Sequence, residues 1–277
     1  PGGGSEIIIT KLNATGTALI GSRMIGGAGD DGVNINYNRA GDLSLQQNYG
    51  DDGRSEVIID GAGNIYVASC SQSVGTAASA KFPTTAGAFQ QVSGGGPDNQ
   101  DAVILKFTPD LSTNLFSTYL GGRGNDAAYV LSLSPNGDLF VAGGTQSDDF
   151  PGSHAGTVGT ALHGAFNTNS ALGDVDGFIA QLSNNGANLI RSTFIGTPQI
   201  DQVYGIQFDR NGFPYITGQT QGAWPIINAP YNNGTSKQFI CKLQPDLSAY
   251  VYSTTFGNGS ARPNISITAF LVDRCEN

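Results

Sequence analysis

Residues 101–145 read DAVILKFTPDLSTNLFSTYLGGRGNDAAYVLSLSPNGDLFVAGGT, and the prediction of the fold starts from their pattern. It holds four short apolar runs, at 102–107, 115–120, 128–133 and 139–142. Turn-forming sequences separate the runs, namely Pro-Asp, Gly-Gly-Arg-Gly-Asn and Pro-Asn-Gly. Short apolar runs bounded by such residues are typical of strands joined by tight turns. The stretch therefore predicts an antiparallel meander of four strands.

The same text recurs along the chain in two halves. The first half appears at 55–69, 129–143, 204–218 and 267–277. The second half appears at 6–27, 101–122, 176–196 and 237–257. Recurrence at this period indicates a solenoid or a propeller, in which each repeat is one supersecondary unit.

Composition agrees with an all-β fold. The 277 residues include 40 glycines, which suits a protein with many turns. No long run shows the 3.6-residue periodicity and caps of a helix. Many of the expected strands are continuous apolar runs, such as AVIL and FLV, so both faces of each small sheet should be buried. Packing of each sheet between two neighbours, as in a β-propeller of four-stranded antiparallel blades, meets that need.

The repeats divide the chain into blades, counted from an inner strand to an outer one. The expected units are a partial blade at 6–27, an insertion loop at 28–54, blades at about 55–120, 128–195 and 203–256, and the start of a next blade at 265–277. Propellers have four to eight blades, so the chain is expected to form part of a larger propeller. The alternative is a four-bladed ring in which the last inner strand completes the partial blade.

Charge and apolar content exclude two classes of partner. The formal net charge is −9 and there is no basic cluster, which argues against nucleic acid and anionic membranes. No apolar stretch approaches the 18 residues of a transmembrane helix. The opening PGGGSE has neither an initiator Met nor a signal sequence, as expected of a fragment or a processed form.

Cys70, Cys241 and Cys275 lie far apart, and separate buried thiols are expected.

Two stretches resemble a known repeat family. STYLGGRGNDAAYVLSLSPNGDLFVAGGTQSDDFP at 117–151 and FPTTAGAFQ at 82–90 look like the SBBP-type β-propeller repeat. The ending AFLVDRCEN at 269–277, with the preceding blades, is similar to large cell-surface proteins of gliding bacteria exported by type IX secretion. The resemblance implies an extracellular module at the surface of a bacterium with an outer membrane. Its implied partners are surface proteins, glycans or outer-membrane secretion components, and its implied roles are adhesion and gliding.

The long connections all emerge on one face of such a propeller, and binding is expected there. Each of the three long loops after the second strand has an aromatic motif, and the candidate binding residues are Phe82, Phe150, Phe166, Trp224 and Tyr231. Exposed aromatic side chains could stack on sugar rings or anchor a protein. The competing interpretation is that they fix each loop to its own blade.

Acidic residues suggest a possible Ca²⁺ site on the same face. An Asp precedes the inner strand at Asp52, Asp126 and Asp201, and Asp51 precedes the first of them. Converging carboxylates could provide some of the six to eight oxygens that Ca²⁺ prefers. The competing interpretation is that each Asp closes a turn that starts the strand. The acidic 28–54 insertion is expected to be a solvated loop.

Catalysis is not expected. The two histidines, His154 and His163, lie in one loop, and no nucleophile, zinc or phosphate-binding motif is present. Asp148, Asp149, Asp174 and Asp176 could form a carboxylate pair, which leaves a polysaccharide-degrading enzyme as an alternative. The sequence favours a non-catalytic module for protein or glycan binding or scaffolding. The other alternative is a purely structural spacer or a subunit associated with the secretion machinery.

Overall fold

The chain forms β-sheets throughout the part that the computed structural model describes, residues 3–35, 45–48, 50–74, 77, 80–95, 100–152 and 175–273. Those residues contain fourteen strands and one short 3₁₀ helix, and no α-helix. The first seven strands are β1 (Ile7–Leu12), β2 (Leu19–Ile25), β3 (Glu56–Ile59), β4 (Ile65–Ser71), β5 (Asp101–Phe107), β6 (Asn114–Leu120) and β7 (Asp126–Leu133). The others are β8 (Leu139–Thr145), β9 (Asp176–Leu182), β10 (Leu189–Ile195), β11 (Asp201–Phe208), β12 (Pro214–Thr220), β13 (Gln238–Leu243) and β14 (Tyr250–Phe256). The 3₁₀ helix η1 spans Asp51–Gly53.

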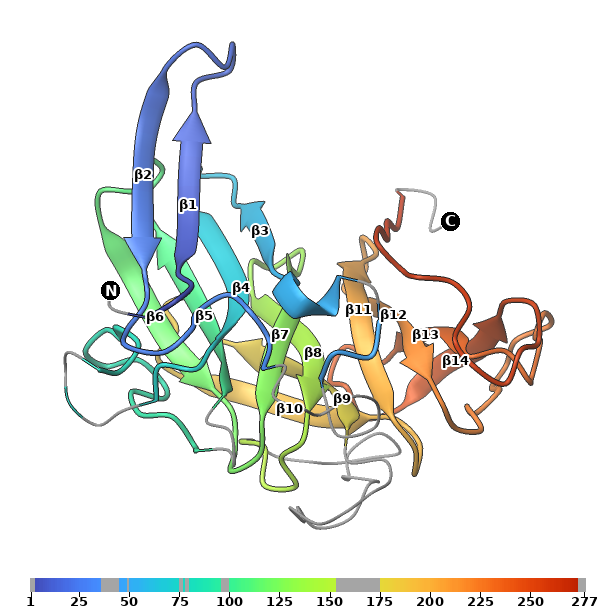
Figure 1. The fold of residues 1–277 in the computed structure, drawn as a ribbon. Coiled ribbons are helices and arrows are strands. Elements are labelled where there is room, and N and C mark those ends of the chain that lie inside the picture. The colour runs from blue at the N-terminus through green and yellow to red at the C-terminus, as the bar shows by residue number, and fades with distance from the viewer. Residues whose placement is uncertain are drawn as a thin grey trace.

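Three sheets have four strands each, and in each one the strands lie in chain order. We call them blade 1 (β3–β6), blade 2 (β7–β10) and blade 3 (β11–β14). β1 and β2 form a two-stranded sheet, the half-blade, beside blade 1. All pairings are antiparallel, as the repeats predict. Figure 1 shows the blades arranged in an arc, with the half-blade at one end and β14 at the other.

The hairpins between the first two strands of the three blades have the same turn geometry. Gly63, Gly137 and Gly212 have φ angles of 84°, 83° and 83°, the left-handed region that glycine adopts without steric cost. In blade 2 the N–H of Gly137 donates to the carbonyl oxygen of Ser134 at 2.8 Å. The turn expected from Pro-Asn-Gly is therefore present, and it fixes the register of the strand pair.

Apolar side chains fill the spaces between consecutive sheets. One cluster includes Ile9, Val67 and Val103, the second Ile104, Leu131 and Phe178, and the third Phe140, Ile206 and Phe239. They join the half-blade to blade 1, blade 1 to blade 2, and blade 2 to blade 3. β8, β9 and β12 are buried on both faces, which confirms the expectation from their continuous apolar sequence.

The last described segment, 265–273, does not form the expected inner strand. It lies against blade 3: the side chain of Gln238 contacts the carbonyl oxygen of Ile265, and Phe270 lies close to Gly205 of β11. A strand here would need hydrogen bonds from a second strand, and the described residues provide none. No helix within the described ranges has the length and apolar character needed to cross a membrane.

Candidate functional site

The aspartate that precedes each inner strand binds a backbone loop. Asp126 accepts hydrogen bonds from the N–H of Gly122 at 2.9 Å and from the hydroxyls of Ser147, at 2.7 Å, and Thr145. Asp201 accepts from the N–H and the hydroxyl of Thr197 in the same way. The side chains of Asp126 and Asp201 therefore close the loop between neighbouring blades.

The first member of this series is Asp31, which corrects the assignment of Asp52. Asp31 accepts from the N–H of Gly27 at 2.8 Å and from the hydroxyls of Ser73 and Ser71. It forms a β-bridge with Ser71, as Asp126 pairs with Thr145. Asp52 is exposed in η1. The insertion thus separates Asp31 from β3, whereas Asp126 and Asp201 each begin their inner strand.

The four aspartates proposed as Ca²⁺ ligands do not converge. Asp51 accepts from Tyr204 and Arg54, whereas Asp126 and Asp201 bind separate loops. Among the residues that the structure describes, no group of three or more His, Cys, Asp or Glu side chains could hold a metal ion.

Asp126 and Asp201 each face a second carboxylate across a glycine. A Cβ atom on Gly121 would lie 2.6 Å from Asp101 Oδ1 and 2.6 Å from Asp126 Oδ2, and Gly196 separates Asp176 from Asp201 in the same manner. Burial raises the pKa of Asp126 to about 7. Burial, and then the charge of Asp126, raises the pKa of Asp101 well above its ordinary value. The loop between blades thus holds paired acids away from water.

The aromatic side chains of the loop motif at Phe82, Phe150 and Trp224 are buried. The hypothesis that they stack on a sugar ring or anchor a protein requires exposed side chains. Phe82 and Phe150 are almost completely covered, and Trp224 is 5% exposed. Trp224 stacks on Phe239 with centroids 3.6 Å apart, and its Nε1–H donates to the Ser253 hydroxyl at 2.7 Å. These three side chains fix each loop to its own blade.

Tyr231 differs from these three because it is 63% exposed. It remains available to a ligand on the long-loop face. Phe166, His154, His163 and Asp174 lie outside the described residues.

The described residues of the 28–54 insertion contact the inner strands, whereas a solvated loop was expected. The carbonyl oxygen of Leu45 accepts from the hydroxyl of Tyr129 at 2.8 Å and from Gln202 Nε2 at 2.7 Å. Asp51 Oδ2 accepts from the hydroxyl of Tyr204 at 2.8 Å. The Tyr129 and Tyr204 rings stack with centroids 5.8 Å apart. Both tyrosines follow the repeated aspartate by three residues, a sequence signal that could have indicated this contact.

A small cavity lies where the inner strands converge. Its volume is about 310 Å³, and β3, β7, β11 and the segment 268–270 line it. Arg54 lies over the Tyr204 ring at 4.3 Å and pairs with Asp51 at 3.0 Å. Burial raises the pKa of Glu56, which accepts from the N–H of Leu131 at 2.6 Å. The cavity is polar and partly closed by the insertion.

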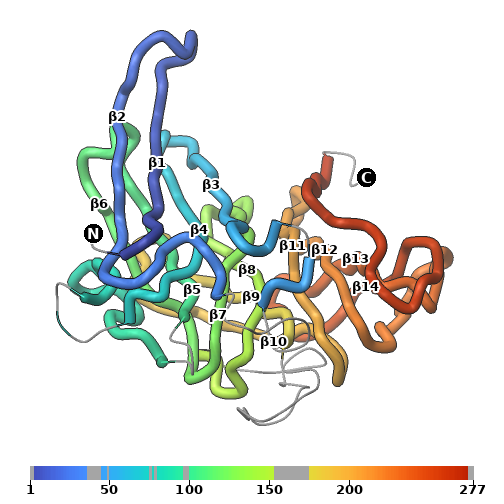
Figure 2. The backbone as a smooth tube through the Cα atoms, viewed as in Figure 1, coloured from blue at the N-terminus to red at the C-terminus, as the bar shows by residue number. Residues whose placement is uncertain are grey.

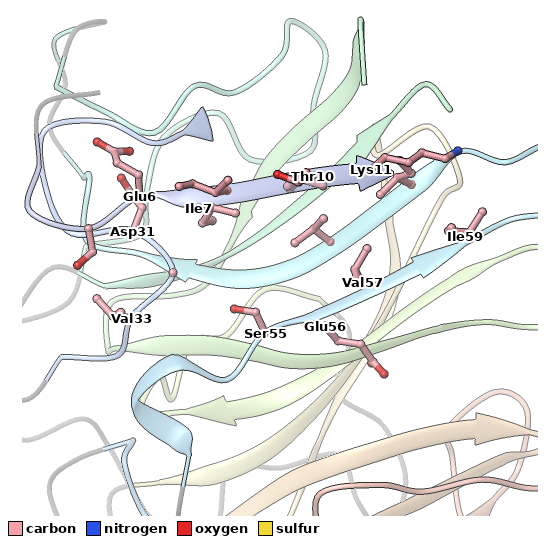
Figure 3. Close-up of a pocket in the computed structure, with 16 residues that line it drawn as sticks. Glu6, Ile7, Thr10, Lys11, Asp31, Val33, Ser55, Glu56, Val57 and Ile59 are labelled. Atoms are coloured by element: carbon pink, nitrogen blue, oxygen red, sulfur yellow. The ribbon is translucent and has the colours of Figure 1, made fainter. Parts of the chain in front are cut away.

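A larger and more apolar groove lies between the half-blade and blade 1 (Figure 3). It has a volume of about 550 Å³. Its walls are β1, β3 and β4 with residues 31–33, and Val57 and Ile59 of β3 are exposed in it. Glu6, Asp31 and Glu56 add acidic groups to the lining. We call it the edge groove; nothing in the sequence repeats indicated it.

Three of the residues proposed for an enzyme lie in the described part of the chain, namely Asp148, Asp149 and Asp176. Asp148 pairs with Arg123 at 2.5 Å, and Asp149 accepts from the Arg123 N–H at 2.8 Å. Asp176 is buried at the start of β9. Cys70 and Cys241 are free buried thiols whose pKa values burial raises.

Successive four-stranded meanders, packed face to face with their first strands toward a common centre, are blades of a β-propeller. The family comparison agrees with this class. A family model for the SBBP β-propeller repeat matches residues 190–223, which run from β10 through β12 into the following loop. A search of curated proteins found no match to the chain.

Proposed function

We propose that this chain is a non-catalytic propeller module that binds a protein partner through the edge groove. The observation that supports this most is the open apolar wall formed by Val57 and Ile59, which are 57% and 58% exposed. Contiguous exposed apolar surface rimmed by polar groups is typical of an interaction site. The alternative site, the aromatic loop motif, has its three described Phe and Trp side chains buried.

The proposed setting is the outer surface of a bacterium, in a secreted protein that contributes to adhesion or gliding. The similarity of the blades and of AFLVDRCEN to type IX-exported surface proteins supports this setting. The net charge of −9 suits a module that avoids nucleic acid and anionic lipid. Surface proteins and outer-membrane secretion components are the proposed partners, with a glycan as a second class of ligand on the Tyr231 face.

The test compares three immobilised proteins. They are the native chain, the Val57→Lys/Ile59→Lys variant, and a matched Leu115→Lys/Ile190→Lys variant, whose changes lie on exposed outer-strand positions. A protein from a cell-surface extract that is retained by the first and third but not by the second, and that rebinds after purification, is the expected result. Equal retention of the partner by all three proteins, or no retention by any of them, would contradict the proposal. The second outcome would favour a purely structural spacer.

Glycan binding is measured with the same proteins on a glycan array. Because Trp224 is buried, the informative variant for this ligand is Tyr231→Ala. Specific retention lost with Tyr231→Ala would move the binding site to the long-loop face.

A further inference from the structure

β1 has one open edge. In the three complete blades the third strand, β5, β9 or β13, lies between a second and a fourth strand. β1 occupies the third position of the half-blade and, within the described residues, pairs with β2 alone. An open strand edge presents backbone N–H and C=O groups that can pair with another strand.

The side chain of Val57, beside this edge, is exposed at a position that is buried in the other blades. Val57 of β3 pairs with Val67, as Leu131 pairs with Val141 and Ile206 with Ile216, so the three residues occupy one repeat position. Leu131 is 0% exposed and Ile206 is 2% exposed, but Val57 is 57% exposed. The same position is therefore covered in blades 2 and 3 and open in blade 1.

Leu131 and Ile206 are covered by side chains from the second and third strands of the preceding blade. Leu131 packs in one cluster with Tyr66 and Ala68 of β4 and Ile104 of β5. Ile206 packs with Phe140 and Ala142 of β8 and Ile179 of β9. At Val57 the third strand, β1, is present, and a second strand is the element that remains to be supplied.

The second strands share a sequence pattern that fits this place. They read Tyr66-Val67-Ala68, Phe140-Val141-Ala142 and Tyr215-Ile216-Thr217, that is, aromatic, β-branched, small. The aromatic member reaches the next blade: the Phe140 ring contacts Phe208 with centroids 4.8 Å apart. Phe208 pairs with Pro214 as Ile59 pairs with Ile65, so Ile59 occupies the corresponding position in blade 1.

We propose that the edge groove binds a β-hairpin consisting of the first and second strands of another copy of this repeat. Its second strand pairs antiparallel with β1, in the register that β4 keeps with β5, and its aromatic side chain covers Ile59. The first strand of the hairpin lies on the axial side, toward β3. This inference rests on the proposed protein-binding function and specifies the partner by its strand order and its aromatic, β-branched, small pattern.

The first test adds the hairpin in trans. A labelled peptide with the sequence of residues 126–145 is titrated into the native chain, and fluorescence anisotropy gives the Kd. We expect saturable binding that weakens about tenfold or more with Val57→Lys/Ile59→Lys, or with Phe140→Lys in the peptide. Leu115→Lys/Ile190→Lys should leave the Kd unchanged. A scrambled peptide that binds equally well would overturn the proposal in favour of a general apolar site.

An isolated hairpin is marginally stable, so a second measurement supplies it in cis. Residues 126–145 are joined ahead of Pro1 by a Gly/Ser linker, which gives the docked hairpin a high effective concentration. The fusion should unfold about 4 °C or more above the native chain, and Val57→Lys/Ile59→Lys should remove that rise. Absence of a rise, together with absence of binding in trans, would overturn the proposal.

Two other outcomes identify a different occupant. Sedimentation that shows a dimer of the native chain, abolished by the groove variant, would replace the hairpin with a second copy. A surface protein captured through the groove while both hairpin tests fail would leave the proposed function standing and reject this partner.

Discussion

The Tyr204 hydroxyl donates a 2.8 Å hydrogen bond to Asp51 Oδ2, which joins inner strand β11 to the 3₁₀ helix η1 across 153 positions of sequence. Arg54 approaches both residues, pairing with Asp51 and lying over the Tyr204 ring. In Figure 2 the segment that contains η1 crosses the space between the blade 1 strands and β11. The end of the insertion, residues 51–54, is therefore part of the packed centre of the molecule.

Removal of this one hydroxyl should destabilise the fold. Tyr204→Phe leaves the buried Asp51 carboxylate with one donor fewer, and we expect a loss of about 1–3 kcal/mol in the free energy of unfolding. Urea unfolding measures the difference. Tyr231→Phe, which changes an exposed tyrosine, is the matched control and should stay within about 0.5 kcal/mol of the native chain. Equal effects of the two changes would argue against a structural insertion.

The indole of Trp224 should matter for stability. Trp224→Ala removes a side chain that stacks on Phe239 and donates to Ser253, and large-to-small core changes of this kind cost about 3–5 kcal/mol. Thermal unfolding of Trp224→Ala and Tyr231→Ala gives the comparison. Full stability of Trp224→Ala would mean that the loop is not fixed to blade 3 by this residue.

The loss of stability on truncating a side chain at one repeat position should depend on whether a neighbouring blade covers that position. Leu131→Ala should lose about 2–5 kcal/mol, because blade 1 covers this side chain. Val57→Ala occupies the same repeat position and should lose about 0.5 kcal/mol or less, because Val57 is largely exposed. Denaturant unfolding of the two variants tests the difference. Similar losses would show that Val57 is covered in solution.

The acid pair across Gly121 predicts a pH dependence. The pKa of Asp126 in the folded chain is raised to about 7, so the folded state holds its proton more tightly than the unfolded state does. Its contribution to stability is therefore fully present below about pH 4 and is lost as the pH rises through about 7, by about 1.4 kcal/mol for each unit of pKa shift. The charge of Asp149 adds to the effect of burial on Asp126, and the charges of Asp126 and Asp149 add to the effect of burial on Asp101.

Asp101→Asn isolates this effect. The change removes the Asp101 carboxyl, whose pKa burial and then the charge of Asp126 raise, so the loss of stability between pH 5 and pH 8 should be smaller in the variant than in the native chain. Urea unfolding at both pH values gives the slopes. Identical slopes would show that the Asp101 carboxyl does not contribute to the pH dependence of stability. Asp110→Asn, a change at an exposed turn, provides the control.

Much of the architecture could be predicted from sequence because the repeats fix it locally. Alternating turns and apolar runs gave the strands, and Gly137 in Pro-Asn-Gly gave the hairpin. The assignment of Asp52 to the repeated aspartate position was wrong, because GAGDDG and YGDDGR both resemble the loop before an inner strand. Only the contacts of Asp31 with Gly27, Ser71 and Ser73 distinguish them, and these depend on β4 being in place.

The site was less predictable, because burial of a loop residue depends on a partner distant in sequence. Trp224 occurs in a loop motif that is equally compatible with ligand stacking, and its burial follows from Phe239 and Ser253. The edge groove depends on which neighbour a strand lacks in space. Val57 and Leu131 have similar surroundings in sequence and opposite exposure in the structure.

Hydrogen–deuterium exchange of β1 measures whether a protein partner binds at the edge groove. It is measured by mass spectrometry on the chain alone and with the protein partner retained through the groove. Residues 7–12 should exchange faster than the equivalent residues 102–107 in the free chain, and should become protected when the partner binds. Protection confined to the loop around Tyr231, or unchanged exchange of residues 7–12 in the complex, would contradict binding at the edge groove.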